Sequence, residues 1–97
     1  MIEGSNYHHG NLREALLQAA LTLLDNEGIE SVGIRQVAKL VGVAHSAPAN
    51  HFKNKSALIT ALNIHIVFHL VDTIKHGLDI NETDLKIVIR RFTKIVL

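Results

Sequence analysis

The sequence predicts an all-α fold, with three helices in the first half of the chain, a long fourth helix and a fifth. Three observations predict it. Apolar residues recur at helical spacing in several segments, glycines and asparagines stand where those segments end and begin, and no segment reads convincingly as a strand. The 97 residues, 47% of them hydrophobic, give room for one small domain with a limited core.

The first helix is predicted over residues 12–26. Asn11 followed by Glu14 has the pattern of an N-terminal cap in which each side chain bonds the other's backbone. Gly28 ends the helix, because glycine adopts the left-handed conformation at little cost. The apolar stripe consists of Leu12, Leu16, Ala19 and Leu23, widened by Ala15, Ala20 and Leu24.

Two short helices joined by a glycine turn are predicted next. The first has one apolar face and ends at Gly42; the second covers residues 44–51, with Pro48 in its first turn, where a missing N–H costs least. We expect Val43 and Phe52 to point into the core. The apolar face consists of Ile34, Val37, Ala38 and Val41. Two short helices around a tight turn form a helix-turn-helix.

The fourth helix is predicted from after Asn54 to about residue 76, with an apolar surface around much of its circumference. Its longest uncharged run, residues 56–71, is shorter than the roughly 20 residues that a membrane span needs, so we expect no membrane association. Asn81 and Asp84 are expected to cap the fifth helix.

Charge is unevenly distributed, although the net charge is only +1. Residues 31–71 contain no Asp or Glu, but they include Arg35, Lys39, Lys53 and Lys55. One face of the protein could therefore carry positive potential. The alternative is chance clustering within a charge-poor stretch.

Several functional classes are excluded or disfavoured by residue content. The absence of cysteine excludes a disulfide scaffold, a thiol nucleophile and cysteine-ligated metal centres, and it fits a cytoplasmic protein. The first residues lack the pattern of a signal peptide. No Gly-rich phosphate loop, nucleophile–base motif or carboxylate pair is recognisable, so we expect neither an enzyme nor a cofactor.

His65 and His69 stand four residues apart on the fourth helix, with Asp72 and His76 continuing the same side. This spacing can chelate a divalent transition metal. The preferred interpretation is the polar stripe of a mostly apolar helix, so we assign no metal site and keep His65 and His69 as secondary candidates.

The middle of the chain resembles a known family. From Gly28 it reads GIESVGIRQVAKLVGVAHSAPANHFKNKSAL, which is similar to the DNA-binding domain of tetracycline-repressor (TetR) family transcriptional regulators. The resemblance covers about residues 8–62 and implies a homeodomain-like, three-helix fold. Its key features are Gly28, Val37-Ala38, Gly42-Val43, His51-Phe52, Lys55 and Leu58.

The resemblance also implies roles for particular residues. The third helix would enter the DNA major groove, where His45, Ser46, Ala47 and Asn50 would face base edges. Arg35 would reach a guanine or a phosphate, and the backbone would be held by His51, Lys53 and Lys55. The implied function is a transcriptional regulator, most often a repressor, whose homodimer binds a pseudo-palindromic operator in double-stranded DNA.

Two features depart from the family pattern. Ala49 stands where the family usually has a tyrosine that contacts the DNA backbone, and Gly33 stands where a capping Ser or Thr is usual. Members are also about twice as long, with a ligand pocket and dimer interface in a C-terminal helical domain. We therefore expect an arm and DNA-binding domain in residues 1–54, and a connecting helix with the start of a truncated C-terminal domain in residues 55–97.

The short C-terminal part affects the expected partners. With most of the ligand domain absent, control by a small-molecule effector is not expected. The alternative function is a shortened regulator that acts mainly as a homo- or hetero-oligomerising interaction module and binds DNA weakly.

Overall fold

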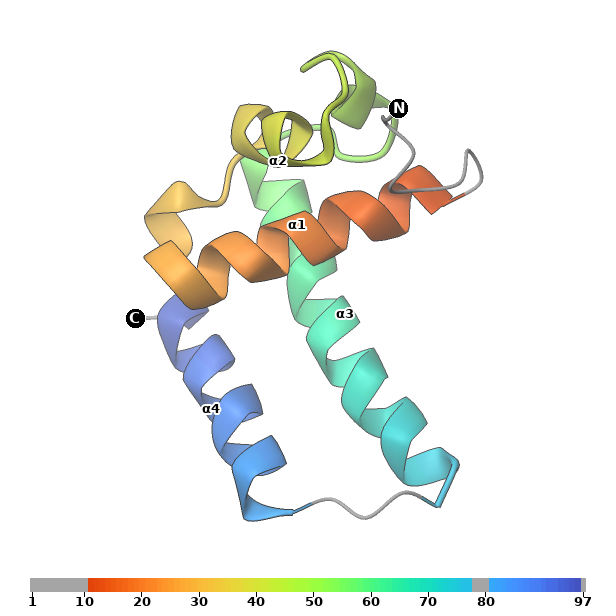
Figure 1. Cartoon of the computed structure of the whole chain (residues 1–97), viewed down its shortest axis with the longest axis vertical. Coiled ribbons are helices and arrows are strands. Elements are labelled where there is room, and N and C mark those ends of the chain that lie inside the picture. The colour runs from red at the N-terminus through yellow and green to blue at the C-terminus, as the bar shows by residue number, and fades with distance from the viewer. Residues whose placement is uncertain (1–10, 78–80, 97) are drawn as a thin grey trace.

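The computed structural model describes residues 11–77 and 81–96, and within these residues helices joined by turns are the only regular elements (Figure 1). The predicted all-α fold is confirmed. The predicted N-terminal arm lies outside the described residues. The helices are α1 (Leu12–Glu27), α2 (Ile34–Val41), α3 (Lys55–Lys75) and α4 (Glu82–Val96), with short 3-10 helices η2 (Ile29–Ser31) and η3 (Ala47–Asn50).

The helix α1 lies across α3 and contacts each of the other three α-helices. Figure 1 shows α2 at one end of α3 and α4 beside its other end. The core forms where α1, α2 and the first half of α3 meet, because each presents its apolar face there. Its largest side chains are Leu16, Leu17, Leu24, Val32, Val37, Phe52, Leu58 and Leu62, all at most 2% exposed.

The turn after α2 depends on Gly42, as the sequence predicts. Its φ of +89° lies in the left-handed region, which residues other than glycine rarely adopt. The carbonyl oxygen of Ala38 accepts hydrogen bonds from the N–H groups of Gly42 (2.9 Å) and Val43 (3.0 Å). Val43 is only half-buried, so its predicted place in the core is not fully realised.

The predicted third helix is not an α-helix. Residues 44–46 form a turn, and the segment continues as the short 3-10 helix η3. Pro48 explains the difference: it has no N–H to bond a carbonyl four residues earlier, and the turns close instead through bonds such as Ala47 N–H to Ala44 O (2.9 Å). Pro48 itself is fully buried.

The predicted helix boundaries hold closely, but one predicted cap is wrong. The helix α1 extends one residue further, to Glu27, and Gly28 ends it with φ +97°. Asn11 stands at the N-cap position without the predicted side-chain bond. At α4 the predicted reciprocal cap is confirmed, since Asp84 N–H donates to Asn81 Oδ1 (2.8 Å) and Asn81 N–H donates to Asp84 Oδ2 (3.3 Å).

Basic side chains attach α4 to the end of α1. Arg91 forms a two-point ion pair with Asp25 (2.8 and 3.0 Å), and Lys94 Nζ donates to the carbonyl oxygens of Leu24 (3.2 Å) and Asp25 (2.8 Å). These carbonyls belong to the last turn of α1, where a cation is favoured. By spacing alone, Arg90, Arg91 and Lys94 are predicted to form a solvated basic face beside the apolar stripe of the fifth helix, and this prediction is wrong for Arg91 and Lys94.

By length and composition alone, α3 could cross a membrane: its mean hydropathy is 1.6 over an 18-residue window. The fold gives another reason for this composition. Its buried residues, which include Leu58, Leu62 and Ile66, pack in the core, and Ile66 together with Leu70 lines a small pocket facing α4. Only 22% of that window is buried, so the core accounts for part of this apolar composition.

Replacing Gly42 tests the turn. Gly42→Ala should lower the free energy of unfolding by about 1 kcal/mol, because alanine is strained at positive φ. Gly42→Asn should cost less, since asparagine tolerates this conformation. Urea unfolding followed by circular dichroism measures both, and an alanine variant as stable as the parent would contradict the turn geometry.

Replacing two asparagines tests the caps. The Oδ1 of Asn54 accepts a hydrogen bond from Ala57 N–H at 2.8 Å, so Asn54→Ala should cost about 1 kcal/mol of unfolding free energy. Asn11→Ala is the matched control and should cost only a few tenths, because its side chain makes no such bond. If Asn54→Ala and Asn11→Ala lowered stability equally in thermal unfolding, the hydrogen bond of the Asn54 side chain would not be the source of its capping effect.

Candidate nucleic-acid interface

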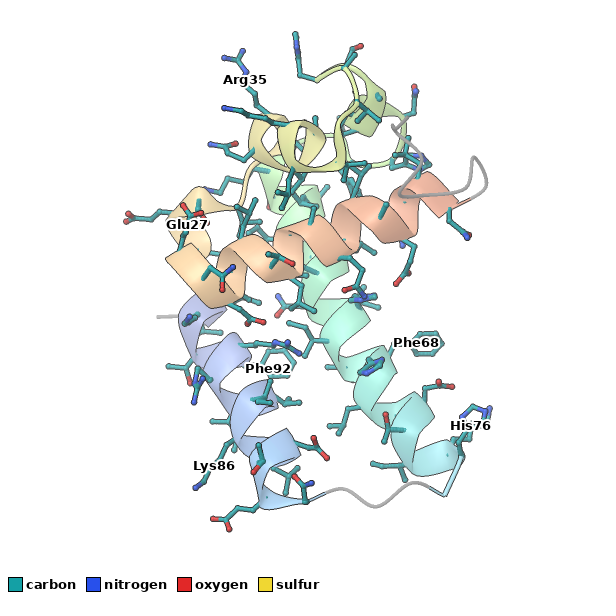
Figure 2. The ribbon with its side chains drawn as sticks, in the orientation of Figure 1. Glu27, Arg35, Phe68, His76, Lys86 and Phe92 are labelled. Atoms are coloured by element: carbon teal, nitrogen blue, oxygen red, sulfur yellow. The ribbon has the colours of Figure 1, made fainter. Side chains whose placement is uncertain are left out.

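The predicted DNA-contacting residues come from three consecutive elements at one end of the molecule: the start of α2, η3 with its flanking turns, and the start of α3. Figure 2 shows Arg35 projecting into solvent at this end, with Lys86 of α4 at the opposite end. The exposed members of the predicted set are Arg35, His45, Ser46, Asn50, His51, Lys53 and Lys55, while Ala47 is half-buried. The fold therefore brings the predicted set to one end, while its contact with DNA stays a prediction.

Two buried residues support η3 from beneath. Pro48 lies within it and Phe52 follows it, and both are at most 2% exposed. The N–H groups of His51 and Phe52 both donate to Pro48 O at 2.8 Å, which ties the end of η3 to the following turn. The polar side chains of this segment are left to face outward. Ala49 is also exposed, so the position where the family usually has tyrosine presents only a methyl group.

The start of α3 combines a helix N-terminus with two lysines. Asn54 caps the helix through its side chain, and its carbonyl oxygen accepts the N–H of Leu58 at 3.1 Å. Lys53 and Lys55 flank this cap and are exposed. Partial positive charge at a helix N-terminus adds to that of neighbouring lysines, so an anion is favoured here.

Arg13 is a candidate that the sequence does not reveal. Its guanidinium lies 5.4 Å from the centroid of the Phe52 ring, and the His51 ring centroid lies 6.2 Å from that of Phe52. In the helical pattern Arg13 is only a polar position on α1. The packing of Phe52 brings it to an open groove of about 470 Å³, lined also by His51 and Asn54.

The cations of this surface have no carboxylate partners among the described residues. Among the described residues, ion pairs join Arg91 to Asp25 and Lys86 to Glu82, and two histidines, His65 and His76, lie within 4 Å of Glu14 and Asp72. None of these pairs involves Arg35, Lys53 or Lys55. Because residues 31–71 contain no acid, the elements that form this end contribute only positive or neutral side chains. Such a surface suits phosphate groups.

The secondary metal candidates point in different directions. His65 faces α1, where its Nε2 lies 3.3 Å from Gln18 Nε2 and 3.8 Å from Glu14 Oε2. His69 is exposed and lines a small pocket of about 190 Å³ between α3 and α4. Across residues 11–77 and 81–96, no three His, Asp or Glu side chains gather as a metal site would require. His65 instead contributes to the contact between α3 and α1.

Known proteins resemble the same part of the chain. Residues 16–62 match the family described as bacterial regulatory proteins, tetR family. The tetracycline repressor protein class C of Escherichia coli is 46% identical over 50 residues, which cover 52% of this chain and 23% of that protein. The HTH-type regulator YvdT of Bacillus subtilis (strain 168) is 33% identical over 67 residues, covering 66% of this chain and 34% of the relative.

A third relative has the same character and coverage. The HTH-type transcriptional regulator BetI of Yersinia pestis is 27% identical over 66 residues, covering 68% of this chain and 33% of that protein. The chain thus spans between 23% and 34% of the length of these relatives. No solved structure matches it significantly. The matched region contains α2, the Gly42 turn and η3, and its relatives are transcriptional regulators. Residues 16–62 of this chain, which contain its helix-turn-helix, therefore match the tetR family of bacterial regulatory proteins, and regulators of that family are among its relatives.

Proposed function

We propose that this chain is a sequence-specific DNA-binding transcription repressor that acts in the cytoplasm on a pseudo-palindromic operator. The observation that carries the proposal is the surface formed by α2, η3 and the start of α3. Exposed polar side chains stand there on a buried support, surrounded by cations without carboxylate partners among the described residues. Repression is supported by the name of the tetracycline repressor among its relatives.

The proposed contacts divide into two kinds. His45, Ser46 and Asn50, with Ala47 beside them, face base edges in the major groove, where each base pair presents its own pattern of donors and acceptors. Lys53, Lys55 and His51 hold phosphates and set the position of the protein, while Arg35 reaches either a guanine or a phosphate. Arg13 joins the phosphate contacts, because its guanidinium lies over Phe52 beside His51.

In the proposed mechanism two copies bind one operator. Each would place η3 in one of two successive major grooves, about 34 Å apart on the same face of the duplex. The bound pair would block access of polymerase to the promoter. The proposal includes no enzyme activity, cofactor or small-molecule effector.

A second candidate function is an interaction module that pairs with itself or a relative and binds DNA weakly. The observation that favours it is the row of exposed apolar side chains on α3, such as Phe68 at 72% exposure. Ala49 also removes one family contact with the DNA backbone. The two functions differ in their response to salt, because DNA binding through phosphates weakens steeply as salt rises and apolar pairing does not.

Selection from a random duplex library tests the proposed function. At near-physiological salt we expect an enriched inverted repeat, whose centre-to-centre spacing is one helical turn or a multiple of it. Sequencing the bound duplexes gives the result. Enrichment of a single half-site would mean that the protein reads DNA sequence but does not bind the operator as a dimer. The absence of any enriched sequence would contradict the proposed function and favour the interaction module.

Variants of the selected complex test the assigned contacts. Lys55→Ala should weaken binding to all sequences and reduce the slope of log K against log salt by about 1, because one phosphate contact is lost. Asn50→Ala should instead relax preference at one base pair by about tenfold. Fluorescence anisotropy titrations measure both. Lys86→Ala, at the far end of the molecule, is the matched control and should leave the slope unchanged; a change equal to that of Lys55→Ala would refute the assignment.

A further inference from the structure

The short helix η3 has two outward faces of different chemistry. A 3-10 helix has three residues per turn, so side chains three residues apart lie one above the other. Ala47 and Asn50 are the first and last residues of η3 and stand in this relation. Because Pro48 between them is buried, Ala47 and Asn50 share one outward face and Ala49 lies on the other. We call Ala47 and Asn50 the reading face.

The segment around the reading face has no side chain of fixed charge. Residues 44–50 read AHSAPAN, without Arg, Lys, Asp or Glu. Arginine and lysine are the side chains that most often recognise guanine, and carboxylates accept from the amino group of cytosine. The cations of the candidate surface stand on the flanking elements, as Arg35 does on α2 and Lys55 on α3. The strongest readers of G·C pairs are therefore absent from the reading face.

The two side chains of the reading face match the two bases of an A·T pair. An asparagine amide can accept from N6–H of adenine and donate to N7 at the same time, and an alanine methyl fits against the C5-methyl of thymine. The amide of Asn50 is exposed and has no hydrogen-bond partner among the described residues, whereas that of Asn54 caps α3. Three residues of a 3-10 helix rise about 6 Å, and one base-pair step is about 3.4 Å. Ala47 and Asn50 can therefore reach base pairs about two steps apart.

We propose that the reading face recognises A·T base pairs, with Ala47 against the C5-methyl of a thymine and Asn50 bonded to N6 and N7 of an adenine. This inference rests on the proposed function and names the bases that η3 reads. Uracil pairs with adenine as thymine does but lacks the C5-methyl, so the methyl contact can be tested without changing the base pairing. The half-site carries A·T pairs opposite η3, whether Arg35 contacts a guanine or a phosphate.

Replacing single thymines of the selected duplex by uracil tests the methyl contact. At one thymine of each half-site, binding should weaken about fourfold, the effect of burying one methyl-sized group. Ala47→Gly should bind the thymine and uracil duplexes equally, because it has no side-chain methyl. Ala49→Gly, on the other face of η3, is the matched control and should keep the parent's ratio. Fluorescence anisotropy titrations measure these ratios.

The ratio is taken between two duplexes bound by the same variant, so a loss of stability shared by both glycine variants cancels. A parent that binds the thymine and uracil duplexes equally at every position would overturn the methyl contact. So would a ratio that is lost in Ala49→Gly and kept in Ala47→Gly.

An adenine analogue without N7 tests the amide contact. Substituting 7-deazaadenine for single adenines should weaken binding of the parent about fivefold at one position of each half-site, because one hydrogen bond is lost. Asn50→Ala should bind the two duplexes equally. Lys55→Ala, which loses a phosphate contact, should weaken binding to both duplexes alike and keep the ratio. Equal binding of both duplexes by the parent at every adenine would refute the contact of Asn50 with N7.

Selection from the random library separates this inference from the proposed function. An enriched inverted repeat with A·T pairs at the positions where uracil and 7-deazaadenine weaken binding supports both. An enriched repeat with a G·C pair where Asn50→Ala relaxes the preference overturns the A·T reading and leaves the proposed function standing. The absence of any enriched sequence contradicts the proposed function, and this inference with it.

Discussion

The packing of Phe52 against α1 and α3 is the contact on which the rest of the structure depends. Phe52 is 2% exposed and belongs to one core with Leu16, Leu62 and Val37. Because it directly follows η3, its burial fixes where the segment of 3-10 turns ends and where α3 begins. A segment with so few hydrogen bonds of its own has little intrinsic stability, so its position comes from the buried residues beneath it.

The same core accounts for the character of the DNA-facing end. Once Pro48 and Phe52 occupy the interior, the polar residues between and around them face solvent. The ion pairs among the described residues form elsewhere, and the shortest of them joins Arg91 to Asp25 at the end of α1 through two hydrogen bonds. Arg35, Lys53 and Lys55 form none of these pairs. A net charge of +1 is compatible with a strongly polarised molecule because the acids and these bases occupy different elements.

The two halves of α3 have different surroundings. Its first half packs in the core against α1, whereas its second half contacts α4 on one side and leaves Phe68, Val71 and Ile74 exposed on the other. The helix α4 packs Val88, Phe92 and Ile95 against the edge of the core, and near its C-terminal end Lys94 donates hydrogen bonds to the last carbonyls of α1. A helix attached in this way covers only part of its neighbour. The apolar composition of α3 is therefore explained by the core at one end and by an unpartnered face at the other.

Local sequence signals determined the elements of this protein. Gly28, Gly42 and the Asn81–Asp84 pair mark helix ends through backbone conformation and short-range hydrogen bonds, which depend on neighbouring residues alone. The apolar stripes identified much of the core, including Leu16, Leu24 and Val37, but not Leu17 or Val32, which are at most 1% exposed. The acid-free stretch identified the elements that form the positive end. The set of candidate DNA contacts followed from the same stretch together with the family resemblance.

The tertiary structure decided the features that need distant residues to meet. The third segment forms a 3-10 helix because Pro48 lacks the N–H that an α-helix would use, and the burial of Pro48 and Phe52 fixes where this segment lies. Arg91 and Lys94 have the periodicity of a solvated face, and α1 supplied their partners from 66 to 70 residues away in the chain. Arg13 joined the candidate site because the fold packs Phe52, a residue distant in the chain, beside its guanidinium. Short-range patterns specify which face of a helix is apolar, but the energy of each polar side chain depends on what the fold places opposite it.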